Sequence, residues 1–210
     1  MNLSSKENMP VQEKNSYFGV GSFFLELIKI VFWAFLIIAP IRIFLFQPFF
    51  VQGASMEPTF ENNQYLIINE FGYKKTEVGV PGKKFFSVEP FKELKRGDVV
   101  VFRYPKNHSQ FFIKRIVGLP GEKIEVKNNL VTVYNSENPE GLTLDEKNYL
   151  SESTRTSGDA VVKLNENEYF VLGDNRMFSS DSRYWGPVLS SDIIGKVLLR
   201  AWPLDALTVF

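Results

Sequence analysis

The hydrophobic pattern of this chain consists of one long apolar run near the N-terminus, followed by many short apolar segments. The long run covers residues 23–46, is apolar on nearly every side and has its few charged residues near its two ends. A helix of this length crosses the roughly 30 Å hydrocarbon core of a bilayer. We therefore predict a transmembrane helix over residues 23–47, preceded by a polar cytoplasmic tail at residues 1–22.

Two other interpretations of this run remain open from the sequence. A buried core helix would carry a polar face, which the run lacks. A cleaved signal peptide would have a shorter apolar region after a compact basic segment, although a cut after Ala54 would make Ser55 a new N-terminus. The Lys and Arg residues favour a cytoplasmic N-terminus only slightly.

The rest of the chain is predicted to be mainly β. Short runs of β-branched and aromatic residues are bounded by Gly, Pro, Asn or Asp, which is typical of strands. They lie at residues 65–68, 98–102, 111–113, 124–126, 130–134, 169–172 and 193–199. No long amphipathic helix separates them, which favours an antiparallel β-sheet or barrel-like catalytic domain over residues 48–210. Within that domain, residues 135–160 contain many acidic and few apolar side chains, which indicates a solvated polar insertion.

Composition excludes several kinds of partner and chemistry. The 210 residues contain 24 Lys and Arg and 24 Asp and Glu, so the formal net charge is zero. A nucleic-acid partner, which requires an excess of basic residues, is therefore not expected. The chain has no Cys and a single His, His108. A zinc site needs several nitrogen or sulfur ligands, and we predict neither a metal nor another cofactor.

Ser55 and Lys114 are the candidate nucleophile and base. A serine hydroxyl needs a neighbouring base, and His108 falls in a polar turn, so another residue is expected in that role. Lys114 lies in an apolar strand, where Phe112 and Ile116 share its face. Burial there would lower the pKa of the amine from about 10.4 toward neutrality, so that it could accept the serine proton. A lysine that reaches out to solvent from a half-buried strand is the alternative.

Five short motifs follow one another along the chain. They are residues 42–49, Ser55-Met56 with Pro58-Thr59, residues 96–102, Lys114-Arg115-Ile116 with residues 118–122, and residues 173–176 with residues 179–186. In this order they resemble the motifs of type I signal peptidases, the family also called leader peptidases. The resemblance covers roughly residues 23–203, and five motifs in the same order are specific where each alone is not.

The resemblance implies a membrane-bound serine endopeptidase that removes signal peptides from exported preproteins at the outer face of the cytoplasmic membrane. Ser55 would be the nucleophile and Lys114 the general base, and the Ser55 N–H would stabilise the oxyanion. Ser179 would orient the Lys114 amine through a hydrogen bond, and Asp181 and Arg183 would form a supporting ion pair. The family's fold, an antiparallel β-structure with an apolar membrane-facing surface, agrees with the strand pattern.

The resemblance also implies cleavage after small residues, as in Ala-X-Ala. By position, the walls of shallow apolar pockets would be formed by Val51, Met56, Phe112 and Ile113. Core packing is an equally good interpretation of Phe112 and Ile113. The chain departs from the family pattern at Gly53, where some members carry a serine whose hydroxyl completes the oxyanion hole.

Exported preproteins and the lipid bilayer are the expected partners, and the protein translocation machinery is a further candidate. Three other functions remain open. A specialised signal peptidase would process components of pili or other surface structures. A self-cleaving Ser–Lys protein similar to the SOS repressor peptidases would need a DNA-binding segment where the apolar run stands. An inactive membrane-tethered scaffold would have no need for both Ser55 and Lys114.

Overall fold

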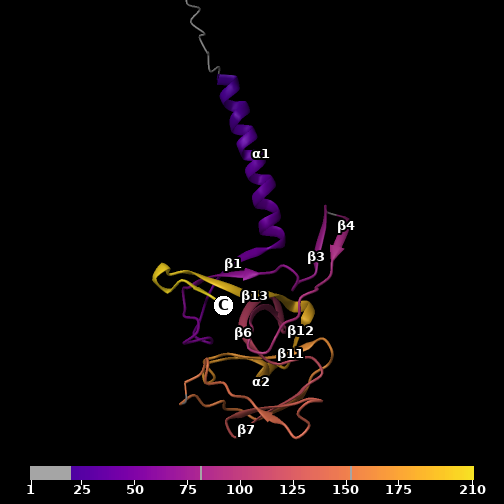
Figure 1. Ribbon diagram of the computed structural model, residues 1–210, viewed down its shortest axis with the longest axis vertical. Helices are drawn as coiled ribbons and strands as arrows, with labels where there is room; N and C mark the ends of the chain where they lie inside the picture. Colours follow the sequence, from indigo (N-terminus) through magenta and orange to yellow (C-terminus); the bar gives the residue numbers. More distant parts are fainter. Residues whose placement is uncertain (1–19, 81, 152) are drawn as a thin grey trace, which may run out of the picture. The chain divides into compact units, whose positions relative to one another are not determined.

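The computed structural model describes residues 20–80, 82–151 and 153–210, which belong to two compact units, Met1–Pro40 and Ile41–Phe210. The predicted transmembrane segment forms helix α1 (Val20–Phe44), drawn in indigo in Figure 1. Its stretch Gly21–Pro40 is long and apolar enough to cross a membrane, and none of that stretch is buried within the protein. Most of the predicted tail, residues 1–22, lies outside the described residues.

The predicted C-terminal limit of the transmembrane segment, residue 47, was wrong. Helix α1 ends at Phe44, and strand β1 (Phe46–Phe50) follows almost at once. A residue that precedes proline is disfavoured in the helical region, and Gln47 precedes Pro48. Strand β1 pairs antiparallel with β2 (Tyr65–Asn69), which supplies the hydrogen bonds that a helix would have made.

The main sheet has eight strands, and its pairings are antiparallel. In spatial order it contains β1, β2, β13 (Ile193–Trp202), β5 (Val99–Tyr104), β6 (Asn107–Gly118), β11 (Glu168–Leu172) and β12 (Val188–Leu189), with β14 (Thr208–Val209) paired to β13. Register shifts in β13 and between β6 and β11 locally disrupt the ladder, as β-bulges do. The predicted fold class, mainly antiparallel β after an N-terminal apolar helix, is therefore confirmed.

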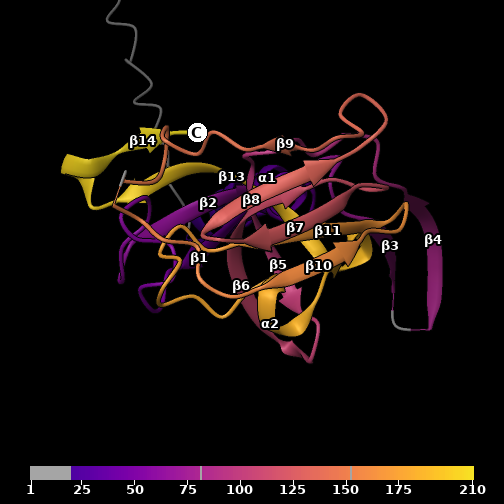
Figure 2. The same ribbon diagram turned by 90° about the horizontal axis from the view of Figure 1, so that it is seen from below.

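A second sheet covers part of the first. It contains β10 (Ala160–Lys163), β7 (Lys123–Lys127), β8 (Leu130–Tyr134) and β9 (Leu142–Thr143), and these strands lie side by side in Figure 2. Alternate residues of β7 and β8 are buried, which is the pattern of strands with one face toward a core. Their buried side chains pack with Val117 of β6 and with Phe170 and Leu172 of β11.

The remaining elements are short. Strands β3 (Thr76–Val80) and β4 (Lys83–Val88) form a separate hairpin that the strand pattern did not predict. Helix α2 (Ser182–Trp185) and two 3-10 turns, η1 (Ser190–Asp192) and η2 (Leu204–Ala206), complete the described structure. All seven predicted strands are present, with boundaries shifted by a few residues.

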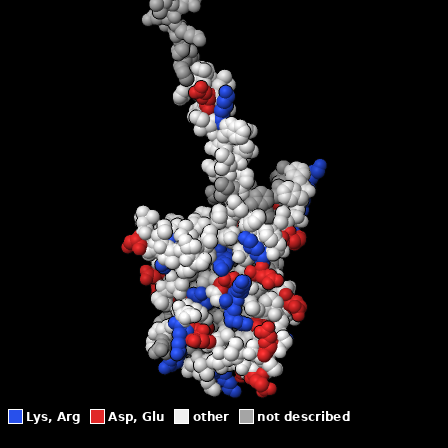
Figure 3. All heavy atoms as spheres, viewed as in Figure 1, with Lys and Arg blue, Asp and Glu red and all other residues white. Residues whose placement is uncertain are grey.

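Charge is distributed without a dominant sign on the face drawn in Figure 3. Blue and red side chains alternate over it, as expected for a chain with 24 basic and 24 acidic residues. No large single-sign patch appears on this face that would favour a polyanionic or polycationic partner.

Candidate active site

Ser55 lies in a tight turn between two buried anchors. Val51 is 4% exposed and Met56 is 1% exposed, and both belong to the core cluster beneath β1, β2 and β13. Gly53 has a φ of +91°, a conformation that favours glycine, and its N–H donates to Asn62 Oδ1 at 2.9 Å. The turn therefore leaves Ser55 half-buried with its position set from both sides.

Lys114 reaches Ser55 from strand β6. Its Nζ lies 2.7 Å from Ser55 Oγ and 2.8 Å from the carbonyl oxygen of Ile113. The residue is only 3% exposed, with Nζ 5.5 Å from the centre of the Phe112 ring. The alternative of a lysine that reaches out to solvent is thereby excluded, and two residues 59 positions apart meet through the fold.

The environment of Lys114 changes the acidity of its amine. Burial lowers the pKa of Lys114 from 10.5 to about 8, because a charged ammonium loses its hydration there. The carboxylates of Asp181 and Asp174 raise the pKa and so oppose part of this shift. A substantial share of the amine is therefore neutral in mildly alkaline solution, and a neutral amine can accept a proton.

The segment after β11 holds the Ser55 turn from the other side. The N–H of Asn175 donates to the Ser55 carbonyl oxygen at 3.1 Å, and its Nδ2 donates to the Ala54 carbonyl oxygen at 3.0 Å. Gly173 lies so close that a Cβ atom there would overlap the Ser55 carbonyl oxygen and the Ser179 hydroxyl. Glycine is required at position 173 because the two segments touch.

Ser179 is near this contact, but the expected hydrogen bond to Lys114 is not made. Ser179 is 5% exposed, and its Oγ has no hydrogen-bond partner among the described residues. The N–H groups of Lys114 are directed to Ser55 Oγ and to the Ile113 carbonyl oxygen instead. The structure thus brings Ser179 into the site without giving it the contact that the resemblance implied.

Asp181 and Arg183 form the expected ion pair. Arg183 Nε donates to Asp181 Oδ1 and Nη2 donates to Oδ2, both at 2.8 Å, and the two side chains are almost fully buried. Asp181 also caps helix α2 and accepts the Gly173 N–H at 3.1 Å. The pair therefore ties the segment that carries Ser179 back to Gly173.

A groove of about 590 Å³ opens beside the Ser55–Lys114 pair. Val51, Phe112 and Ile113 line it, as their predicted pocket roles require, together with residues on either side of Ser55. Met56 does not line the groove, because its side chain is packed inward against the core cluster that contains Phe60. The assignment of Met56 to a pocket wall is therefore corrected: it anchors the turn from beneath.

Comparison with known proteins identifies the family. Residues 24–202 match the family model described as "Signal peptidase, peptidase S26". The chain belongs to the signal peptidase family. Members of this family are serine endopeptidases that cleave signal peptides from exported proteins, and the Ser–Lys dyad is general to them. This protein is accordingly a membrane-anchored signal peptidase with an N-terminal apolar helix.

Individual relatives agree with the family match. The chain is 34% identical over 184 residues to signal peptidase I P of Bacillus subtilis subsp. natto, covering 86% of this chain and 90% of that one. It is 32% identical over 191 residues to signal peptidase IB of Staphylococcus aureus, covering 86% and 91%. A crystal structure of a signal peptidase I from Enterococcus faecalis V583 matches at 32% identity with a TM-score of 0.41, covering 50% of this chain and 97% of that chain.

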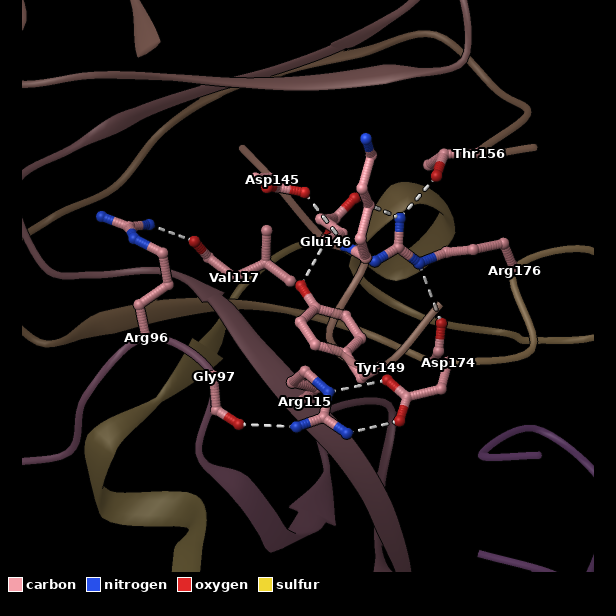
Figure 4. Close-up of polar contacts among 12 residues, drawn as sticks. Arg96, Gly97, Arg115, Val117, Asp145, Glu146, Tyr149, Thr156, Asp174 and Arg176 are labelled. Atoms are coloured by element: carbon pink, nitrogen blue, oxygen red, sulfur yellow. Dashed lines mark hydrogen bonds and ion pairs between the residues drawn. The ribbon is translucent and has the colours of Figure 1, made fainter. Parts of the chain in front are cut away.

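Sequence reasoning missed a buried polar network beside the Ser55–Lys114 pair of this signal peptidase (Figure 4). Arg115, the residue after Lys114, donates to Asp174 through Nε at 2.8 Å and through Nη2 at 2.6 Å. Asp174 also accepts the Thr59 hydroxyl at 2.6 Å, and Arg115 Nη1 donates to the Gly97 carbonyl oxygen at 2.8 Å. These residues all fall in the five motifs, which was the signal that could have found them.

His108 lies outside the groove beside Ser55 and Lys114. His108 lies at the start of β6 rather than in a turn; its side chain is 59% exposed and 3.8 Å from Asp192, and it does not line the groove. Within residues 20–80, 82–151 and 153–210, no group of three or more His, Asp or Glu side chains is placed to hold a metal ion.

Proposed function

We propose that Ser55 is the nucleophile of this signal peptidase and that Lys114 is its general base. The observation that carries the proposal is the 2.7 Å contact between Lys114 Nζ and Ser55 Oγ, made by an amine that is only 3% exposed. A hydrogen bond of this length is short enough for direct proton transfer. The single histidine, His108, lies outside the groove and is not placed to act as the base in its stead.

The reaction then takes two steps. Ser55 Oγ attacks the carbonyl carbon of the scissile peptide bond while its proton passes to the neutral Lys114 amine, and a tetrahedral oxyanion forms. As that intermediate collapses, Lys114 gives the proton to the leaving amine, and the signal peptide remains esterified to Ser55. A water molecule, deprotonated by Lys114, then attacks the ester carbonyl. The bond to Ser55 Oγ breaks, Ser55 takes the proton back from Lys114, and the signal peptide leaves as the acid.

The oxyanion is proposed to be held by the backbone N–H of Ser55. That group has no hydrogen-bond partner among the described residues, so it is available to a ligand. Gly53 cannot supply the hydroxyl that some family members place at its position, and its own N–H is bound to Asn62. One strong donor therefore carries the oxyanion hole, and such a donor contributes about 3 kcal/mol to transition-state binding in other serine proteases.

Ser179, Asp181 and Arg183 are proposed to support the base. The unpartnered hydroxyl of Ser179 is proposed to bind the Lys114 amine once the Ser55 proton has been transferred, when the lysine needs an acceptor. Asp181 and Arg183 would keep the Ser179 segment in place, and the Asp181 carboxylate would favour the ammonium formed during attack.

The substrate is proposed to be a preprotein with small residues before the cut, of the Ala-X-Ala type. Support comes from the groove, where Val51, Phe112 and Ile113 leave shallow apolar space beside Ser55. Helix α1 is proposed to span the lipid bilayer with residues 1–22 in the cytoplasm and residues 48–210 outside, where exported chains emerge. The protein translocation machinery remains a candidate partner.

A cleavage assay with matched variants tests this assignment. Purified full-length protein in detergent would be given a precursor with an Ala-X-Ala site, and the products would be identified by mass spectrometry. Ser55→Ala and Lys114→Met are expected to cut at least about 1000-fold more slowly than wild type. Lys106→Met, which removes an exposed lysine near the start of β6, is the control and should cut at the wild-type rate.

The outcomes separate the competing functions. Full activity of folded Lys114→Met would mean that another group is the base. Absence of cutting by wild type on several precursors would favour the scaffold interpretation. A cut at a site other than the last small residue would overturn the assigned substrate class.

A further inference from the structure

Three residues of the predicted polar insertion, Glu146, Tyr149 and Thr156, lie against two arginines that flank the active site (Figure 4). We call these three residues the strap. Thr156 is 3% exposed and the Glu146 side chain is 12% exposed. This part of the insertion therefore differs from the solvated segment that its composition indicated.

The first contact of the strap is with Arg115. The centre of the Arg115 guanidinium lies 4.1 Å from the centre of the Tyr149 ring, a stacking distance. Arg115 is held in plane on its other edge by two hydrogen bonds to Asp174. Because Arg115 follows Lys114 on strand β6, the Tyr149 ring restrains the backbone that carries the base.

The second contact of the strap is with Arg176, whose side chain is fully buried. Glu146 accepts from Arg176 Nη2 at 2.5 Å and from Nη1 at 2.9 Å, and Thr156 Oγ1 accepts from Nη1 at 2.5 Å. Arg176 Nε in turn donates to the carbonyl oxygen of Gly173 at 3.1 Å. Gly173 is the residue packed against Ser55, so this contact restrains the nucleophile turn.

The two contacts are joined to each other. The Tyr149 hydroxyl donates to Glu146 Oε1 at 2.7 Å, the same oxygen that binds Arg176 Nη2. Burying these charges costs desolvation, and apolar side chains of similar size commonly give equal or greater stability. The hydrogen bonds between these charged groups are directional, so the charged arrangement fixes how the side chains are oriented.

We propose that the strap is a positioning element for cleavage: Glu146 and Tyr149 hold Arg176 and Arg115, and through them keep Ser55 and Lys114 aligned. None of the three strap residues lines the groove, so none of them touches the substrate. The inference rests on the proposed roles of Ser55 and Lys114. Small misplacements of reacting groups are costly, and a shift of about 1 Å can lower a rate by about 100-fold.

Steady-state kinetics on four variants of the full-length protein test the proposal. Tyr149→Leu removes the ring but leaves the charged groups paired, and Tyr149→Phe keeps the ring while removing the hydroxyl. Glu146→Gln removes one charge, and Glu140→Gln makes the same change at an exposed position of the same insertion. Rates are expressed per folded molecule, with folding followed by circular dichroism and active sites counted by titration.

Positioning predicts a fall in kcat with little change in KM. We expect about a tenfold lower kcat for Tyr149→Leu and for Glu146→Gln, from loss of the stacked and ionic contacts. Tyr149→Phe should stay within about threefold of wild type because the stacking remains, and Glu140→Gln should be unchanged.

Several results would overturn the proposal. One is an unchanged kcat per folded molecule for both Tyr149→Leu and Glu146→Gln. Another is equal losses in Tyr149→Phe and Tyr149→Leu. If Glu146→Gln does not fold, the Tyr149 pair decides alone. Failure of wild type to cleave would instead reject the proposed function, which keeps the two failures distinguishable.

Discussion

Gly173 and Ser55 approach so closely that a Cβ atom at position 173 would overlap the Ser55 carbonyl oxygen and the Ser179 hydroxyl. We predict that Gly173→Ala displaces the nucleophile turn and lowers cleavage per folded molecule by at least about tenfold, because reacting groups tolerate little displacement. Stability should fall by about 1–3 kcal/mol, the usual cost of overpacking.

Gly118→Ala is the matched control for Gly173→Ala. A Cβ atom there would lie 2.6 Å from Ile124 and 2.8 Å from Phe170, in the core between the two sheets. This variant should lose stability to a similar extent and keep its activity per folded molecule. Cleavage rates and urea unfolding measured together would decide, and equal losses of activity in both variants would contradict the assignment.

Lys114→Met should make the protein more stable near neutral pH. Folding lowers the pKa of Lys114 from 10.5 to about 8. Below about pH 8 the amine is protonated in both states, and the folded state is destabilised because the unfolded chain binds that proton more tightly. That cost is about 3 kcal/mol, reduced by about 1 kcal/mol for each of the two lost hydrogen bonds, to Ser55 Oγ and to the Ile113 carbonyl oxygen. Urea unfolding at about pH 7 should therefore show a net gain of roughly 1 kcal/mol.

The difference in stability between Lys114→Met and wild type should become smaller as the pH rises. Between about pH 8 and about pH 10.5 the unfolded chain still binds the proton while the folded protein does not, so wild-type stability rises with pH and the gap to Lys114→Met narrows. A gap that widens over this range, or a variant less stable than wild type at about pH 7, would refute burial as the cause of the lowered pKa.

The groove walls should control which side chains are accepted before the cut. Ile113→Ala enlarges the space beside Ser55, so cleavage of a precursor with Leu in place of the last Ala should rise relative to the Ala precursor. Met56→Ala is the control, since Met56 is buried in the core and its removal should cost about 2–5 kcal/mol of stability without changing preference. The ratio of kcat/KM values for the two precursors is the measurement; an unchanged ratio in Ile113→Ala would remove Ile113 from the pocket.

Asp181→Asn should move the pH dependence of cleavage toward acid. The Asp181 carboxylate raises the pKa of Lys114, so its loss lowers that pKa further and makes the amine neutral at lower pH. The pH at which the rate is half-maximal, measured on the folded fraction, should fall below the wild-type value. A shift toward alkaline pH would show that Asp181 acts on Lys114 in some other way.

Local pattern predicted the β-rich domain, and the resemblance carried by the five motifs named Ser55 and Lys114 as the candidate pair. Alternation in β7 and β8 reflects one buried face, and Lys114 stands in an apolar strand whose burial could be inferred from its neighbours. The end of helix α1 was missed because pairing of β1 with β2, a tertiary contact, replaces the last helical turn.

Other features depend on contacts between distant segments. Glu146 and Tyr149 lie in a polar sequence whose composition predicts a solvated segment. They are buried because Arg176 and Arg115, from distant parts of the chain, contact them. Met56 was placed in a pocket wall because it is apolar and adjacent to Ser55, whereas the turn directs it into the core. Such directions follow from tertiary geometry, which sequence spacing does not encode.

The central claim, that a neutral Lys114 deprotonates Ser55, is tested most directly by the pH dependence of single-turnover cleavage. With excess enzyme over precursor, between about pH 6 and about pH 10, the rate should rise through a midpoint near the pKa of about 8 and then level off. The rise follows the fraction of neutral amine. A rate that is flat over this range, or that falls with increasing pH, would contradict Lys114 as the base.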